Sequence, residues 1–185
     1  MKSNILIKTF LAVLLIISGL LVHAQTKVSI NQGWEFSKSE TAKGWEKVNL
    51  PHTWNAEDVI DEIPSYYRGV GYYKKTLNIV PTKNQKVYLQ FEGANNNTEL
   101  FINQKSVGKH VGGYTAFIFD VTPFLNANGK NEVLVKVDNA VDFNDLPVSA
   151  DFTFYGGIYR DVFLVVKNDV HFDMMNFGSP GVFVS

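Results

Sequence analysis

The run Val133-Leu134-Val135-Lys136-Val137-Asp138 decides the fold class of this chain. A valine stands at every second position, and Leu134, Lys136 and Asp138 stand between them. Successive side chains of a β-strand point to opposite faces, so the three valines share one face and the intervening residues share the other. The run therefore predicts a strand that buries one face against a neighbouring layer.

Similar short runs recur along the chain, with clusters of Gly, Asn, Asp or Pro between them. Residues 87–92 alternate in the same way and predict a second half-buried strand; further strands are expected at 28–30, 72–80, 99–103, 106–108, 115–121 and 161–166. The polar run 103–105 predicts a hairpin turn. No segment after the N-terminal region has a convincing helical period. Because each half-apolar strand needs a second sheet to cover it, the sequence predicts an all-β domain, a β-sandwich or a barrel.

The N-terminal region has the pattern of a secretory signal peptide. Lys2 and Lys8 stand before or at the start of an uncharged run at 9–22 that is rich in Leu and Ile, and Ala24 provides a small residue before the expected cleavage point. The apolar run is shorter than the roughly 20 residues that span a bilayer, which disfavours the alternative of a retained membrane anchor. We therefore expect residues 1–24 to be removed and the mature domain to be exported, to the periplasm or the extracellular space.

Charge and composition exclude several classes of protein. The chain has 17 basic and 18 acidic side chains, a net charge of −1, and the two lysines of the leader account for two of the basic ones. The remaining Lys and Arg residues are scattered among acids and form no basic stripe, so nucleic acid is not an expected partner. The absence of cysteine excludes disulfides and thiolate chemistry.

The usual hydrolytic motifs are missing from the sequence. His52, His110 and His171 have no metal-ligand spacing, and the chain has neither a nucleophile elbow nor a phosphate-binding loop. Acidic residues cluster at 58–62 and could supply paired carboxylates for glycoside hydrolysis, although a solvated acidic loop is the favoured interpretation. The residues alone thus give no support for catalysis by this chain.

One stretch combines the side chains that hold a sugar. In Asp151-Phe152-Thr153-Phe154-Tyr155-Gly156-Gly157 a carboxylate stands among aromatic rings before a glycine turn. A carboxylate accepts hydrogen bonds from neighbouring hydroxyls, and flat rings cover the C–H faces of a pyranose. The alternative is that Asp151 only forms a turn, as Asp beside glycine often does.

Two motifs give the chain a family resemblance. Gly108-Lys109-His110-Val111-Gly112-Gly113-Tyr114 and Phe154-Tyr155-Gly156-Gly157-Ile158-Tyr159-Arg160, with support from residues 50–55, 68–75 and 178–184, resemble the N-terminal sugar-binding domain of family 2 glycoside hydrolases, in particular exported β-galactosidases of Bacteroidetes. The resemblance covers essentially the whole mature chain. Gln104 departs from the glycine that usually follows Asn103 in this family, which affects a turn and no catalytic group.

The resemblance implies a fold and a domain plan. It implies a jelly-roll β-sandwich of the galactose-binding-domain type at 25–168, then a linker and the first strand of a truncated immunoglobulin-like domain at 169–185. In full-length relatives a TIM barrel with both catalytic glutamates follows. The residue that corresponds to Asp151 reaches into that barrel, contacts the sugar and helps to ligate a sodium ion. The loop before residue 69 also approaches the sugar, which nominates Arg68 for substrate binding, with a surface ion pair as its alternative.

The expected function follows from this plan. We expect a non-catalytic domain that completes the sugar subsite of a glycosidase barrel, binds a galactoside or related glycan there, and hydrolyses nothing alone. A free-standing carbohydrate-binding module and a structural spacer are the alternatives. The family also contains β-glucuronidases and β-mannosidases, so the resemblance does not choose the substrate.

Two further groups of residues are assigned to the framework. Arg160 and Asp161 open a strand and face opposite sides of it, so an ion pair that pins the end of the sheet is expected. Trp34, Trp45 and Trp54 fall among the early strands and loops, where core or interface packing is expected in preference to a sugar platform.

Overall fold

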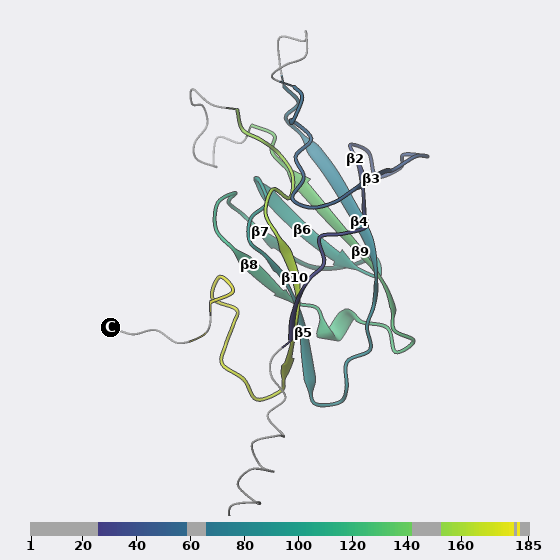
Figure 1. Cartoon of the computed structure of the whole chain (residues 1–185), viewed down its shortest axis with the longest axis vertical. Coiled ribbons are helices and arrows are strands. Elements are labelled where there is room, and N and C mark those ends of the chain that lie inside the picture. The colour runs from purple at the N-terminus through teal and green to yellow at the C-terminus, as the bar shows by residue number, and fades with distance from the viewer. Residues whose placement is uncertain (1–25, 59–65, 142–152, 180, 182–185) are drawn as a thin grey trace, which may run out of the picture.

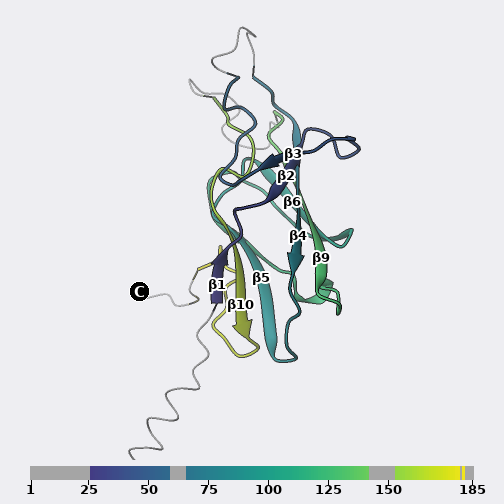
Figure 2. The same cartoon turned by 45° about the vertical axis from the view of Figure 1, so that its right-hand side comes forward.

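The computed structural model describes residues 26–58, 66–141, 153–179 and 181, and this part of the chain forms two antiparallel sheets. The smaller sheet has the order β1 (Thr26–Ser29), β10 (Val162–Asn168), β5 (Gln85–Phe91) and β8 (Phe117–Asp120). The larger sheet has the order β3 (Glu46–Val48), β2 (Trp34–Ser37), β4 (Val70–Asn78), β9 (Lys130–Asp138), β6 (Asn97–Ile102) and β7 (Lys105–His110). The two sheets form the two layers of a sandwich (Figures 1 and 2). The prediction of an all-β sandwich is confirmed.

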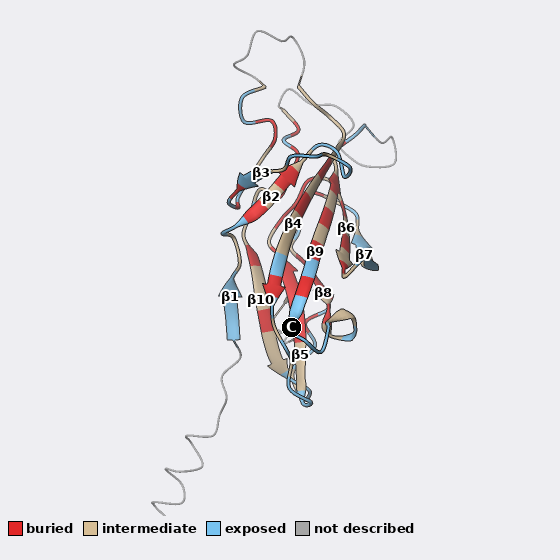
Figure 3. Ribbon diagram, turned by 90° about the vertical axis from the view of Figure 1, so that its right-hand side faces the viewer, coloured by how far each residue is buried: buried red, intermediate tan, exposed pale blue. Residues whose placement is uncertain are grey.

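β9 shows how the sequence pattern produces the layers. Val133, Val135 and Val137 are fully buried between the sheets, whereas Leu134 and Lys136 lie half-exposed on the outer face. Buried and exposed bands therefore alternate along the strand (Figure 3). The only helical element of the described residues is the 3₁₀ turn η1 (Thr122–Phe124).

The core lies between the two inner faces. Its large, fully buried side chains include Trp34, Tyr73, Phe91, Leu100 and Ile158. Packing of this kind stabilises each large apolar side chain by about 1.5–3 kcal/mol relative to exposure in water. Since the described residues contain no disulfide, this apolar contact is the main source of stability.

β5 differs from the sequence prediction, because both of its faces are buried. Tyr88 and Gln90, expected on an exposed face, are each 5% exposed. The segment after β10 folds back across this face, where Met174 packs against Tyr88 in one buried cluster and Gly178 lies close to Gln90. The Tyr88 hydroxyl also lies 2.8 Å from His171 Nε2. The prediction of a half-buried strand was wrong here because a segment remote in sequence covers the strand.

The turn between β6 and β7 is the expected hairpin corner. Asn103 and Gln104 have φ angles of 51° and 67°, the left-handed values of a two-residue hairpin turn. The Asn103 side chain holds the turn, since its Nδ2 donates to the Phe124 carbonyl at 2.8 Å and its Oδ1 accepts from the Glu132 amide at 2.9 Å. Gln104 occupies a conformation that glycine adopts more easily.

The start of β10 is held differently from the prediction. Asp161 Oδ1 accepts a hydrogen bond from Asn31 Nδ2 at 2.8 Å, and Asn31 Oδ1 accepts from the Val162 amide at 2.9 Å. Arg160 donates to the Glu92 carbonyl at 3.4 Å. Neither Arg160 nor Asp161 belongs to an ion pair among the described residues, so the expected ion pair is not observed there. An asparagine bridge pins this corner instead.

The three tryptophans have framework positions. Trp34 is fully buried and Trp54 is 7% exposed, which confirms core packing for both. Trp45 is half-buried, and the Lys74 ammonium lies 4.2 Å from the centre of its ring. Its ring thus lies at the surface beside the larger sheet.

Two expectations fall on residues that the structure does not describe. The signal peptide at 1–24 and the fresh strand at 182–184 both lie outside the described residues, and the domain boundaries stay predictions. Within the described residues, no helix has the length and apolar character that a membrane span requires.

Candidate functional site

Two site residues were predicted from the sequence, and one of them, Arg68, lies among the described residues. It stands in the loops at one end of the sandwich. This half-buried side chain stands just before β4, and its Nε donates to the Asn139 carbonyl at 2.9 Å. Its guanidinium carbon lies 4.7 Å from the centre of the Phe154 ring. The three ion pairs among the described residues do not include Arg68, so the surface ion pair considered as its alternative is not observed there.

The contacts of Arg68 reach both ends of the Asp151 segment. Asn139 precedes residues 142–152 in the chain and Phe154 follows them. Asp151 itself lies outside the described residues, so its prediction as a sugar or sodium ligand stays a prediction. The structure brings described residues from either side of this segment, Asn139 and Phe154, into contact with Arg68.

Asn139 fastens the Arg68 loop to the segment that follows Asp151. Its side chain is 1% exposed; the Oδ1 accepts from the Gly69 amide at 2.8 Å and the Nδ2 donates to the Phe154 carbonyl at 2.9 Å. The Asn139 amide also donates to the Gly69 carbonyl at 3.1 Å. A buried amide with all these partners satisfied fixes the relative position of the segments it joins.

A second buried asparagine joins the same loops from the other side. Asn55 is 0% exposed, and its Nδ2 donates to Asp58 Oδ2 and to the Tyr67 carbonyl, both at 2.8 Å. Its Oδ1 accepts from the Gly156 amide at 2.7 Å. Asp58 Oδ2 also accepts from the Tyr67 amide at 2.8 Å. We refer to Asn55, Asp58 and Asn139 with these partners as the end-loop network.

The electrostatics of Asp58 fit a framework role. Partial burial raises the pKa of this carboxyl, but hydrogen bonds from the Tyr67 amide and the Asn55 side chain, with help from Lys38, outweigh it and lower the pKa. The carboxylate is therefore charged at neutral pH and is used as an acceptor. This corrects the interpretation of Asp58 as part of a merely solvated acidic loop; the other acids of that loop, Asp61 and Glu62, lie outside the described residues.

Glycine is required where the network meets Trp54. A Cβ atom on Gly156 would lie 2.1 Å from Cζ2 of Trp54 and 2.6 Å from Nδ2 of Asn139. Trp54 also donates from Nε1 to the Tyr67 carbonyl at 3.4 Å. The glycine of the motif therefore lets the tryptophan and the asparagine close over the backbone.

The aromatic residues after Asp151 divide into a buried and an exposed one. Phe154 is 6% exposed and its ring lies beside Arg68, so it supports the loop and offers no open face. Tyr155 is 42% exposed, and its carbonyl accepts from Asn95 Nδ2 at 2.7 Å. Of these two, Tyr155 is the ring that a ligand could reach.

His52 is half-buried and lies beside the Tyr73 hydroxyl. Its Nδ1 lies 2.8 Å from the Tyr73 hydroxyl, and burial lowers the pKa of the imidazole against a smaller opposing effect of Glu46. Burial also raises the pKa of Tyr73 far above its ordinary value. Among the described residues, no three His, Cys, Asp or Glu side chains are grouped so that they could hold a metal ion.

The assignment of Arg68 and Asp151 to a sugar site stays a prediction, and the sequence did not predict the framework around Arg68. Asn55 and Asn139 carried no recognisable signal, because a buried asparagine looks like any loop asparagine until its partners are known. Trp54, Asn55 and the glycines at 156–157 belong to the motifs that resemble the family, but the motifs do not reveal which residues they contact. Their hydrogen bonds across distant loops give the motif its physical reason.

Comparison with known proteins agrees with the resemblance in the sequence. The family model described as glycosyl hydrolases family 2, sugar binding domain, matches residues 20–168. A β-glucuronidase of Bacteroides fragilis is 40% identical over 181 residues, which cover 96% of this chain and 26% of that protein. The chain therefore spans about a quarter of that relative's length.

Solved structures show the same fold at similar identity. The crystal structure of Bacteroides uniformis β-glucuronidase matches with a TM-score of 0.76 and 39% identity, over 85% of this chain and 20% of that chain. The crystal structure of a putative β-galactosidase from Bacteroides fragilis matches with a TM-score of 0.80 and 36% identity, over 88% of this chain and 26% of that chain.

Proposed function

Since this chain belongs to the sugar-binding domains of the family 2 glycosyl hydrolases, we propose that it is a non-catalytic domain of an exported glycosidase. In this proposal its end loops complete the sugar subsite of a catalytic barrel, and the domain hydrolyses no glycoside alone. The leader-like residues 1–24 support export to the periplasm or the extracellular space.

One observation carries the proposal: Arg68 touches a described residue on each side of the segment that contains Asp151. Its hydrogen bond to Asn139 and its contact with the Phe154 ring tie the residues that flank that segment to the loop before β4. The end-loop network fixes these contacts from behind. Precise placement of this kind is what a binding subsite requires, because small displacements of a ligand-binding group weaken its hydrogen bonds.

The chemistry of the two residues suits a sugar. A carboxylate such as that of Asp151 accepts hydrogen bonds from adjacent hydroxyls, each contributing about 1.5–3 kcal/mol when charge-assisted. The Arg68 guanidinium donates from Nε to the Asn139 carbonyl, and no hydrogen bond from its terminal nitrogens to another described residue is observed. Tyr155 adds an exposed ring nearby. Sodium ligation by Asp151 belongs to this proposal as well.

The substrate we propose is a β-glucuronide, with a β-galactoside as the second candidate. Relatives of both kinds match the chain, and the B. fragilis β-glucuronidase shares more identity than the β-galactosidase of Thermoanaerobacter pseudethanolicus, 40% against 34%. A guanidinium also pairs bidentately with a carboxylate, which favours a uronic acid over a neutral hexose.

A chimeric enzyme tests the proposal. Residues 25–168 would replace the matching part of the B. fragilis β-glucuronidase, and kcat/KM would be measured on nitrophenyl β-D-glucuronide and nitrophenyl β-D-galactoside. We expect Asp151→Ala and Arg68→Ala each to lower kcat/KM by about tenfold to a hundredfold, the loss of one charge-assisted hydrogen bond or more.

A matched control separates binding from folding. Arg160 also lies over a ring, that of Tyr159, and also donates to a backbone carbonyl, but it stands at the start of β10. Arg160→Ala should leave kcat/KM within twofold or so of the parent chimera. If Asp151→Ala and Arg68→Ala behave like this control, the domain is a structural spacer. If the chain alone binds the glycosides tightly in calorimetry, it is a free-standing binding module.

A further inference from the structure

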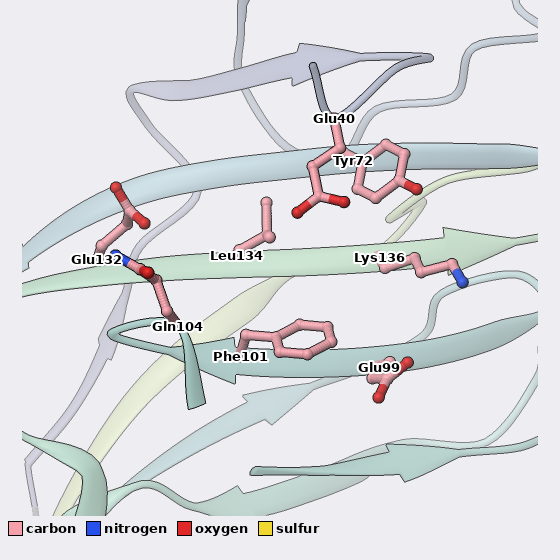
Figure 4. A pocket seen from close by; sticks show the side chains of 8 residues that line it. All are labelled: Glu40, Tyr72, Glu99, Phe101, Gln104, Glu132, Leu134 and Lys136. Atoms are coloured by element: carbon pink, nitrogen blue, oxygen red, sulfur yellow. The ribbon is translucent and has the colours of Figure 1, made fainter. Parts of the chain in front are cut away.

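A hollow of about 480 Å³ lies on the outer face of the larger sheet (Figure 4). Its volume is in the range of small-molecule sites. The side chains that line it come from β4, β6 and β9, from the turn after β6 and from the loop after β2: Glu40, Tyr72, Glu99, Phe101, Gln104, Glu132, Leu134 and Lys136. We refer to this hollow as the sheet groove. None of its residues belongs to the end-loop network.

Strand register places the groove residues in rows across the sheet. Tyr72 stands opposite Lys136, which in turn stands opposite Glu99. In the next row, Leu134 stands opposite Phe101. The two aromatic residues are thus two strands and one row apart, roughly 12 Å between Cα atoms. A saccharide of two or more residues has the length to span this separation.

The groove presents both kinds of partner that a saccharide needs. Tyr72 and Phe101 are half-exposed on the outer face, so their rings can cover C–H surfaces. Glu40, Glu132 and Gln104 are exposed around them and can exchange hydrogen bonds with hydroxyls. Partial burial, together with the carboxylates of Glu40 and Asp138, raises the pKa of Tyr72, so its hydroxyl stays protonated and can donate.

Charge limits the class of saccharide. Three carboxylates and one ammonium line the groove, and Glu99 is paired with Lys109 at 3.4 Å. Neither Glu40 nor Glu132 belongs to an ion pair among the described residues. Their field opposes a uronic acid and leaves neutral sugars unaffected.

We propose that the sheet groove binds a neutral oligosaccharide of two or more residues, independently of the end loops. This site requires no catalytic barrel, unlike the subsite at the end loops. It would hold a neutral part of a glycan chain while the end loops contribute to cleavage elsewhere.

Nuclear magnetic resonance on the isotope-labelled chain tests this site with cellobiose and lactose as probes at millimolar concentration. Amide shifts are expected along β4, β6 and β9 with at least one of the two, and binding of cellobiouronic acid is expected to be about tenfold weaker. Tyr72→Ala and Phe101→Ala should each weaken binding about tenfold. Tyr155→Ala, which removes an exposed ring at the end loops, should leave it unchanged. Glu132→Gln removes one exposed carboxylate from the groove. It should reduce the difference in affinity between neutral and acidic disaccharides.

Three results would overturn the site. If neither neutral probe shifts any amide, the sheet groove does not bind oligosaccharides. The proposal for the end loops would be unaffected, because that subsite needs a catalytic barrel to bind sugar. Shifts around Arg68 and Phe154 in place of the three strands would assign binding to the end loops. Concentration-dependent broadening on β4, β6 and β9 without sugar would show that a second copy of the chain covers this face.

Discussion

Replacing Asn55 by alanine should destabilise the domain far more than its small size suggests. The fully buried Asn55 side chain makes hydrogen bonds of 2.7 to 2.8 Å with Asp58 Oδ2, the Tyr67 carbonyl and the Gly156 amide. At about 1 kcal/mol net for each bond, their loss amounts to about 3 kcal/mol. The Gly156 amide loses its partner altogether, which places the true value at or above this figure.

Urea unfolding followed by tryptophan fluorescence measures this effect, because Trp34 and Trp54 are buried in the folded domain. A loss of about 3 kcal/mol corresponds to a decrease in Tm of roughly 6–12 °C for a domain of this size. Asn128→Ala is the matched control: this exposed asparagine accepts one hydrogen bond from the Lys130 amide at 3.1 Å. Its loss should cost less than about 1 kcal/mol.

The reasoning fails if Asn55→Ala and Asn128→Ala unfold at the same urea concentration with the same slope. Such a result would mean that the end loops relax around the missing amide and that the end-loop network does not hold them. A change in slope alone would instead indicate altered compactness of the unfolded state.

Three further results are expected from the same framework. Gly156→Ala should destabilise by about 1–3 kcal/mol because its Cβ would clash with Trp54, whereas Gly44→Ala, with no atom within 4 Å, should change stability by less than about 0.5 kcal/mol in the same urea titration. Gln104→Gly should increase the free energy of unfolding by up to about 1 kcal/mol and raise Tm, because φ is 67° at this position. An unchanged or lower Tm in calorimetry would argue against strain at this turn. Burial lowers the pKa of His52 in the folded domain, so neutral His52 contributes its full stabilisation above the ordinary pKa of 6.5, and this stabilisation is lost as pH falls below that value. Between pH 7 and pH 5 the Tm of the parent should therefore fall more steeply than the Tm of His52→Gln.

The sequence correctly predicted the strands whose apolar residues alternate and whose one face only is covered by the opposite sheet. β9 agrees with its pattern because only one of its faces is covered. β5 has the same pattern and disagrees, because the segment around Met174 covers its second face. β2 and β3 were not predicted individually, since runs of three or four residues carry too little periodicity.

The framework around Arg68 could not be predicted from the sequence, and the sugar site itself stays a prediction. Arg68 came from a family resemblance, and no local pattern indicated that it would touch both Asn139 and Phe154. The buried asparagines acquire their role only when three loops meet, which is a property of the tertiary structure. Chemistry on a single segment can therefore be read from the sequence, whereas a contact between segments must be observed.

A double-mutant cycle between Arg68 and Asp151 tests the central claim most directly. In the chimeric enzyme, kcat/KM on nitrophenyl β-D-glucuronide would be measured for the parent, Arg68→Ala, Asp151→Ala and the double variant. If Arg68 holds the segment that presents Asp151, the two losses are not additive, and the coupling is about 1 kcal/mol or more. Losses that add to within about 0.3–0.5 kcal/mol would contradict the account, because they would show that Arg68 and Asp151 act independently.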